Sequence, residues 1–177
     1  MDGSRKLSVF IATSLDGYIT AENESLDWLF QVEGEGDNGI GEFYDTVDTI
    51  LMGRKTYDWI MRHENGEFSY KGKECYVFSR SVREETEYVT FVNESPAQLM
   101  NKLKSQRGAV IWLVGGGELL HHFLKENLVD ELILTVAPAV LGSGTPLFGE
   151  GGVELDLTLK RVRQFNQFVE LSYQVNK

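Results

Sequence analysis

The chain has 177 residues, of which 42% are hydrophobic, and this size and composition suit one globular domain spanning residues 1–177. Its 17 basic and 27 acidic residues give a formal net charge of −10, which argues against binding to nucleic acid or to an anionic membrane. No apolar run approaches the ~20 residues of a membrane-spanning helix, and the N-terminal sequence lacks the apolar core of a signal peptide, so we expect a cytoplasmic protein.

The first quarter of the chain predicts a strand followed by a long loop. We expect residues 1–5 to be flexible and a first strand to cover residues 6–13. The Asp-Gly pair of the segment SLDGYI (14–19) indicates a turn. Residues 21–41 are polar and glycine-rich, apart from one predicted helical turn at 26–30. A loop of this length in a compact domain is usually functional.

Three later strands each end in a turn rich in small or basic residues. The strand at 49–52 runs into Gly53-Arg54-Lys55-Thr56 and then a helix. The strand at 74–78 is followed by Ser79-Arg80-Ser81. The strand at 110–114 ends at Gly115-Gly116-Gly117, and a helix covers 118–125. A strand, a glycine turn and a helix N-terminus in succession favour binding of phosphate, because exposed amides and the helix dipole both attract an anion.

The other elements complete an α/β pattern. We expect a short helix at 42–47 and a strand at 88–92. A helix at 95–106 is predicted to be capped by Ser95, with Pro96 in its first position. A strand at 130–136 follows. An antiparallel pair at 157–165 and 169–175 turns at Asn166-Gln167. The sequence therefore predicts a three-layer α/β sandwich, with about eight mostly parallel strands and a C-terminal antiparallel hairpin.

Cys75 is the only cysteine, which excludes an internal disulfide and a cysteine-rich metal site. It lies in an apolar strand pattern, so we expect a buried structural thiol. We predict no metal site.

Four segments together carry a family resemblance. They are SLDGYI (14–19), ILMGRKTY (50–57), WLVGGGEL (112–119) and DELILTVAPAVLGSGTPLF (130–148). In this order they resemble the dihydrofolate-reductase-like superfamily. The similarity is strongest to the RibD C-terminal domain, the reductase half of the bifunctional riboflavin-biosynthesis enzyme. It covers about residues 6–175 and implies a dihydrofolate-reductase-like fold.

The resemblance implies NADPH binding at the carboxyl ends of the sheet strands, where ligands of open α/β sheets also bind as a rule. It assigns Gly53, Arg54, Lys55 and Thr56 to the cofactor phosphates. Ser79 and Arg80 would face the adenosine ribose and its 2′-phosphate, which guanidinium groups favour. The pyrophosphate and nicotinamide would lie near Gly115, Gly116, Gly117 and Glu118. A cis peptide bond between two of these glycines is also implied.

The candidates for catalysis and substrate binding are less sharply defined. The carboxylates considered are Asp16, Asp37 and Glu42. The alternative role of Asp16 is to form a turn, because an aspartate before glycine accepts hydrogen bonds from the backbone of its own turn. Tyr18 and Trp28 are candidates for stacking on a flat heterocyclic substrate, with core packing as the alternative.

Three functions remain open at this point. The first is an NADPH-dependent reductase of a small heterocycle, by resemblance of the 5-amino-6-(5-phosphoribosylamino)uracil reductase type. The second is dihydrofolate reduction, which requires one carboxylate buried opposite the nicotinamide. The third is a non-catalytic nucleotide-binding or regulatory protein. We also expect a homodimer, with residues 137–141 and the C-terminal hairpin as the interface.

Overall fold

The computed structural model describes residues 4–81 and 86–177 of the chain. Its centre is an eight-stranded sheet in the order β5-β4-β3-β6-β1-β7-β10-β9. The strands are β1 (Leu7–Thr13), β3 (Val47–Gly53), β4 (Glu74–Phe78), β5 (Thr90–Val92), β6 (Val110–Gly115), β7 (Glu131–Val136), β9 (Leu157–Phe165) and β10 (Phe168–Val175). All neighbours are parallel until β10, which is antiparallel to both β7 and β9. Two short strands, β2 (Tyr18–Thr20) and β8 (Thr145–Pro146), form a separate antiparallel pair.

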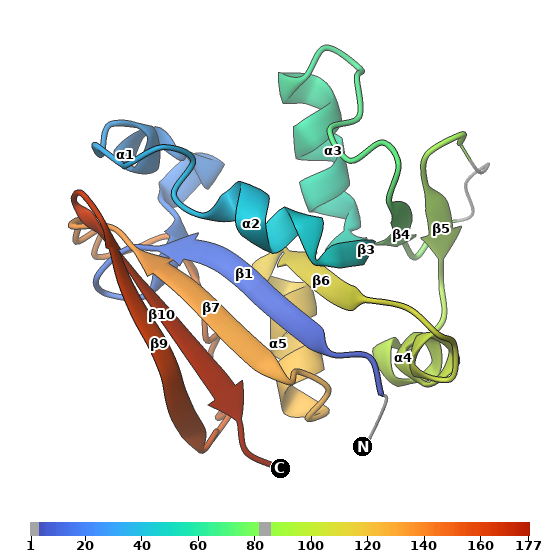
Figure 1. Cartoon of the computed structure of the whole chain (residues 1–177). Helices are drawn as coiled ribbons and strands as arrows, with labels where there is room; N and C mark the ends of the chain where they lie inside the picture. The colour runs from blue at the N-terminus through green and yellow to red at the C-terminus, as the bar shows by residue number, and fades with distance from the viewer. Residues whose placement is uncertain (1–3, 82–85) are drawn as a thin grey trace.

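Helices cover both faces of the sheet, as Figure 1 shows. They are α1 (Asp27–Phe30), α2 (Ile40–Asp45), α3 (Arg54–His63), α4 (Pro96–Lys104) and α5 (Gly117–Lys125), and a 3-10 turn, η1, covers Glu22–Glu24. Successive side chains of a strand point to opposite faces. Leu113 of β6 therefore packs in one core cluster with Phe123 of α5, whereas the adjacent Trp112 packs in the other with Phe43 of α2. The predicted three-layer fold is confirmed.

The boundaries of most elements agree with the sequence pattern. Ser95 caps α4 as predicted: its Oγ accepts the N–H of Gln98 at 3.2 Å, and the Gln98 side chain accepts the N–H of Ser95 at 3.0 Å. The helix expected at 42–47 instead covers Ile40–Asp45. It begins earlier because the Asp37 carboxylate accepts the N–H groups of Gly39, at 2.9 Å, and Gly41, at 3.0 Å, ahead of and within its first turn.

The prediction that residues 1–5 are flexible is wrong for Arg5. Residues 1–3 lie outside the described residues, whereas Arg5 is only 5% exposed. Its guanidinium pairs with the carboxylate of Asp48, donates to Thr49 Oγ1 at 2.7 Å and donates to the carbonyl of Ala109 at 3.0 Å. A guanidinium with this many partners can be buried without an unpaired charge, so the ordered chain includes Arg5.

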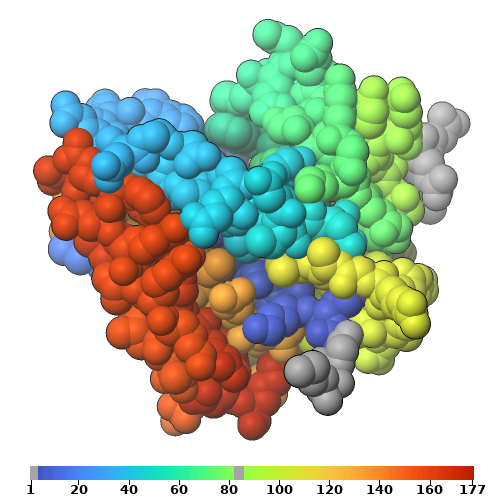
Figure 2. All heavy atoms as spheres, viewed as in Figure 1, coloured from blue at the N-terminus to red at the C-terminus, as the bar shows by residue number. Residues whose placement is uncertain are grey.

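Helix α2 adds a contact to the C-terminal hairpin, which is already part of the sheet through the pairing of β10 with β7. In Figure 2 it lies across the viewed face between the hairpin (red) and α3 (green). Arg163 of β9 donates to the Glu42 carboxylate of α2 at 2.8 Å. Within residues 4–81 and 86–177, no helix combines the length and apolar character needed to cross a membrane.

Candidate functional site

The site begins where β3 and β6 end side by side. The two strands are parallel neighbours, so their carboxyl ends meet at one edge of the sheet. A Cβ placed on Gly53 would lie 3.5 Å from the backbone nitrogen of Gly116, and one placed on Gly116 would lie 3.4 Å from Thr56 Oγ1. The structure therefore brings together the two glycine turns that the sequence predicts to hold cofactor phosphates.

Two helices start from these turns without a capping side chain. Helix α3 follows Gly53 and has 10 residues, helix α5 follows Gly116 and has 9, and neither receives a side-chain cap. The first N–H groups of a helix have no partner within the helix, and the dipole makes this end positive. The adjoining helix starts thus form a surface suited to an anion.

The glycine turn before α5 leaves its backbone open. The Gly115–Gly116 peptide is cis, as the resemblance implies, and the φ of Gly115 is +139°. Nothing lies within 4 Å of the position that a Cβ on Gly115 would occupy. Glycine adopts this positive φ without strain and has no side chain. A flat ligand can therefore lie directly against the main chain at Gly115.

Arg54 connects the turn after β3 with the turn after β4. It donates from Nε to Asp58 at 2.9 Å, and from Nη1 to the hydroxyl oxygens of Ser79, at 3.2 Å, and Ser81, at 3.1 Å. These contacts hold the guanidinium at the strand ends, half-buried. Fixed in this way, it can bind an anion with a smaller loss of side-chain freedom than a mobile surface arginine.

The remaining predicted cations are more exposed. Lys55 is exposed, and Arg80 lies 3.6 Å from the Glu118 carboxylate, with 94% and 72% of the two side chains accessible. This ion pair joins the turn after β4 to the first turn of α5. An anion that binds Arg80 would replace the Glu118 carboxylate as its partner. Loss of the Arg80–Glu118 pair costs little free energy, because ion pairs between exposed side chains are weak.

A wall beside the glycine turn is formed by two distant segments. The strand β2, from the SLDGYI segment, pairs with β8, and Thr20 Oγ1 donates to Thr145 Oγ1 at 3.0 Å. A Cβ on Gly117 would lie only 2.9 Å from Thr145 Cγ2. The wall therefore stands directly against the start of α5, and glycine is what permits this approach.

Asp16 holds in place the loop that precedes β8 in this wall. Its carboxylate accepts the Ser14 hydroxyl at 2.6 Å and the backbone N–H groups of Gly142, at 2.8 Å, and Leu141, at 3.1 Å. The hydrogen bond from Ser14, followed by those from the backbone, lowers the pKa of Asp16 from 3.8 to about 2. The group is ionised at neutral pH and positions the loop before β8.

The other two carboxylates predicted as catalytic have partners elsewhere. Asp37 accepts the N–H groups at the start of α2, as described above. Glu42 pairs with Arg163 at 2.8 Å and with Arg161 at 3.7 Å, and Arg163 lowers the pKa of Glu42. Neither lines the hollows described next. Their catalytic roles stay predictions.

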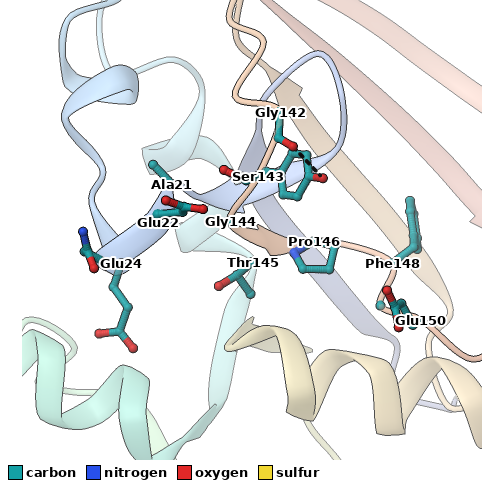
Figure 3. Close-up of a pocket in the computed structure, with 13 residues that line it drawn as sticks. Ala21, Glu22, Glu24, Gly142, Ser143, Gly144, Thr145, Pro146, Phe148 and Glu150 are labelled. Carbon is teal, nitrogen blue, oxygen red and sulfur yellow. Dashed lines mark hydrogen bonds between the residues drawn. The ribbon is translucent and has the colours of Figure 1, made fainter.

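The wall borders a hollow of about 800 Å³, which we call the acidic hollow (Figure 3). It is lined by Tyr18, Ala21, Glu22, Asn23, Glu24, Gly142, Ser143, Gly144, Thr145, Pro146, Phe148, Gly149 and Glu150. Tyr18, predicted to contact substrate, is among these residues, and its hydroxyl donates to the Gly142 carbonyl at 3.4 Å. Trp28 is not. It donates its indole N–H to the carbonyl of Ser25 at 3.1 Å.

A second hollow, of about 410 Å³, adjoins the first between α1 and the outer half of α3. We call it the aromatic hollow. It is lined by Asn23, Glu24, Ser25, Leu26, Asp27, Phe30, Trp59, Arg62 and His63. Asn23 and Glu24 of η1 line both hollows, so the loop predicted to be functional at residues 21–41 forms the boundary between them.

Several residues of this region do not follow from sequence reasoning. Three residues were not predicted as site residues, namely Ser81, Thr145 and Glu150. Ser81 lies within the predicted turn at 79–81, and Thr145 lies in the segment 130–148 that carries the family resemblance. The available signal was the polar character of the turn at 79–81 and the glycine-rich sequence of the loop at 142–152. The pairing of β2 with β8 joins residues more than 120 positions apart, and no local pattern specifies it. Among the described residues, no group of three His, Cys, Asp or Glu side chains is placed to hold a metal ion.

Comparisons with known proteins agree on the family. A family model described as the RibD C-terminal domain matches residues 5–171. The uncharacterized protein YwjB of Bacillus subtilis (strain 168) is 48% identical over 170 residues, which cover 96% of this chain and 97% of the relative. A solved structure from Shewanella sp. PV-4, of a protein named for riboflavin biosynthesis, is 31% identical, with a TM-score of 0.86 and coverage of 97% and 99%. Acinetobacter baumannii RibD shares the fold at 16% identity, with a TM-score of 0.72 over 98% of this chain and 58% of that one.

Proposed function

The chain belongs to the RibD C-terminal domain family, and on that premise we propose that it is an NADPH-dependent reductase of a small heterocyclic substrate. The reaction would be of the 5-amino-6-(5-phosphoribosylamino)uracil reductase type. The observation that carries the proposal is the meeting of two uncapped helix starts at adjacent strand ends, with Arg54 fixed beside them.

The residues at this edge fit the chemistry of the cofactor. The open backbone at Gly115 and the bare N–H groups of α3 and α5 suit a pyrophosphate and a flat ring. Arg54 and Ser79 would hold a phosphate, and Arg80 would serve the 2′-phosphate that distinguishes NADPH from NADH. When bound, the cofactor supplies a hydride. The protein's task is orientation and the exclusion of water.

The substrate would occupy the acidic hollow, because its wall adjoins the glycine turn through Thr145 and Gly117. Reduction of a carbon–heteroatom double bond adds one hydride to carbon and one proton to the heteroatom. Asp16 is attached to the wall of this hollow, and its role there is positioning, since a group with a pKa of about 2 carries no proton at neutral pH. Tyr18 would contact the substrate ring.

A titration with NADPH and NADH tests the cofactor proposal. We expect micromolar binding of NADPH, detected through tryptophan fluorescence, and weakening by about tenfold in Arg54→Ala, equivalent to ~1.4 kcal/mol. Arg62→Ala, at the far end of the same helix, is the matched control and should bind as the wild type does. Absence of binding to either nucleotide would refute the proposal.

Turnover distinguishes the alternatives that share this fold. NADPH oxidation with ribosylaminopyrimidines supports the reductase type proposed here, and oxidation with dihydrofolate alone would favour the second function. Cofactor binding without oxidation of NADPH by any of these compounds would favour a non-catalytic nucleotide-binding protein.

We also propose a cytoplasmic homodimer. The C-terminal hairpin leaves Leu159, Val162 and Val169 exposed by 52%, 55% and 38%, and Val140 is 70% exposed, although Ala137 is fully buried. Three exposed apolar side chains on one hairpin support an interface there. Sedimentation of the wild type and of Val162→Lys tests this: we expect a dimer and a monomer respectively, and a monomeric wild type would contradict it.

A further inference from the structure

We propose that His121 is a pH-dependent latch for the 148–152 loop. A neutral imidazole holds the loop against the acidic hollow, and a protonated imidazole releases it. The latch itself follows from the fold alone. Its bearing on catalysis rests on the proposed function, which places the substrate in this hollow.

The 148–152 loop has few attachments of its own. It connects Leu147, which is 1% exposed, with Val153, which packs against the core. Three of its five residues are glycines. Among the described residues, no backbone-to-backbone hydrogen bond involves this loop. A segment with so few contacts opens at a low cost in free energy, so one side-chain contact can decide whether it stays closed.

His121 of α5 lies against this loop. A Cβ placed on Gly149 would lie 3.7 Å from Nδ1 of His121, and one placed on Gly151 would lie 3.9 Å from Cε1 and Nε2 of the same ring. The loop also lines the acidic hollow, through Phe148, Gly149 and Glu150. Figure 3 shows Phe148 and Glu150 at one end of the hollow, next to α5. The loop therefore touches both the imidazole and the hollow.

The closed loop leaves one nitrogen of His121 without a partner. Its Nδ1 is buried and receives no hydrogen bond from any described residue. In a neutral imidazole this nitrogen can be the one without a proton, so that only an acceptor is unpaired. A protonated imidazole carries N–H groups at both nitrogens, and Nδ1 would become a charged donor without an acceptor. That arrangement costs more free energy than an unpaired neutral acceptor, and opening of the loop relieves it by admitting water.

The charged groups around this ring do not supply the missing partner. They come from α5 itself and from the chain that begins with the 148–152 loop: Glu118, His122, Lys125, Glu150 and Glu154. The His122 ring has its centroid 6.3 Å from that of His121. None of these groups forms a hydrogen bond with Nδ1. Protonation of His121 should therefore be coupled to opening of the loop, between about pH 5 and pH 8, where histidine side chains change charge.

NMR measurements across a pH series test the latch in the intact protein. We expect the order parameters of the loop glycine amides to fall from about 0.8 at pH 7.5 to below about 0.6 at pH 5. The midpoint of this change should coincide with the midpoint of the chemical-shift titration of the His121 ring protons. His121→Phe keeps an aromatic ring that cannot be protonated, so the loop of this variant should be equally ordered at both pH values.

His122→Phe is the matched control. It removes the neighbouring histidine, which is exposed on the same helix, and it should leave the response of the loop to pH unchanged. Circular dichroism at pH 7 verifies that both variants are folded. If His121→Phe does not fold, the two midpoints in the wild type decide the matter.

The opposite results are equally clear. Loop order that does not change between pH 7.5 and pH 5 overturns the proposal, and so does a change whose midpoint differs from that of His121. A response that persists in His121→Phe, or that His122→Phe also removes, overturns it too. The separate NADPH titration reports on the reductase function. A protein that binds no NADPH but shows the His121-dependent opening would lose the proposed function and retain the latch.

Discussion

The carboxylate of Asp16 accepts the backbone N–H of Gly142 across a 2.8 Å hydrogen bond. The two residues are 126 positions apart, and their contact joins the turn after β1 to the loop before β8. Leu15 N–H, which donates to the carbonyl of Ala139 at 2.7 Å, supports the same junction. This junction sets the position of the wall between the glycine turn and the acidic hollow.

The junction should depend on pH through Asp16. Its pKa is about 2 in the folded chain against an ordinary 3.8, so its contribution to stability is present above pH 4 and is lost as the pH falls toward 2. In urea unfolding, Asp16→Asn should be less stable than the wild type at pH 7, and the difference should shrink between pH 4 and pH 2. Asp45→Asn, an exposed change on α2, is the control. A difference independent of pH would contradict this role.

The close contact at the start of α5 gives a second prediction. Gly117→Ala places a methyl group 2.9 Å from Thr145 Cγ2, and overpacking of this kind costs ~1–3 kcal/mol. Alanine otherwise favours a helix over glycine, so the loss comes from the clash. Thr145→Ser removes the methyl group and keeps the hydroxyl. In a double-mutant cycle monitored by chemical unfolding, Gly117→Ala should be neutral or stabilising in the Thr145→Ser background. Equal losses in both backgrounds would refute the steric explanation.

Local signals predict most of the fold. The apolar run before Gly115 has the length of a buried strand, and the alternation from 169 to 175 indicates a strand with one wet face; both strands are present. Ser95 and Pro96 mark the start of α4. The start of α2 could not be placed in the same way, because it depends on how one side chain, Asp37, hydrogen-bonds to the backbone around it.

The edge of the sheet that we propose binds the cofactor could be predicted from local sequence signals, whereas the acidic hollow could not. Gly53 and Gly116 each end a recognisable strand, and parallel neighbouring strands bring such ends together. The acidic hollow instead depends on pairing between short, irregular segments. In the sequence, Glu22 and Glu150 cannot be told apart from other surface glutamates. They line the same hollow only because β2 pairs with β8 in the folded chain.

The single cysteine, Cys75, should not react with thiol reagents in the native protein. Cys75 is 3% exposed, and burial raises the pKa of its thiol to about 12. Because the thiolate is the reactive form, a disulfide reagent at pH 8 should modify Cys75 only as fast as the protein unfolds. The reaction in 8 M urea is the control and should be complete within minutes. Rapid modification of the native protein without loss of structure would contradict the buried environment.

The ion pair beneath α2 gives the last prediction. Glu170 of β10 is fully buried, and Arg163 binds both of its oxygens, from Nε at 2.9 Å and from Nη2 at 3.1 Å. This hydrogen bonding raises the pKa of Arg163. Removal of one partner of a buried pair costs ~3–5 kcal/mol, and this is an upper bound here, because the Arg163 side chain is 23% accessible and also pairs with Glu42.

Glu170→Gln should approach the lower end of that range, because the amide oxygen still accepts one hydrogen bond and Arg163 keeps Glu42 at 2.8 Å. Glu42→Gln is the natural comparison. Its carboxylate pairs with the same arginine but lies at the surface, where water replaces a lost partner, so its effect on the free energy of unfolding should be clearly smaller. Urea unfolding of both variants at pH 7 measures the difference. Losses of equal size would mean that burial of Glu170 does not determine the strength of this contact.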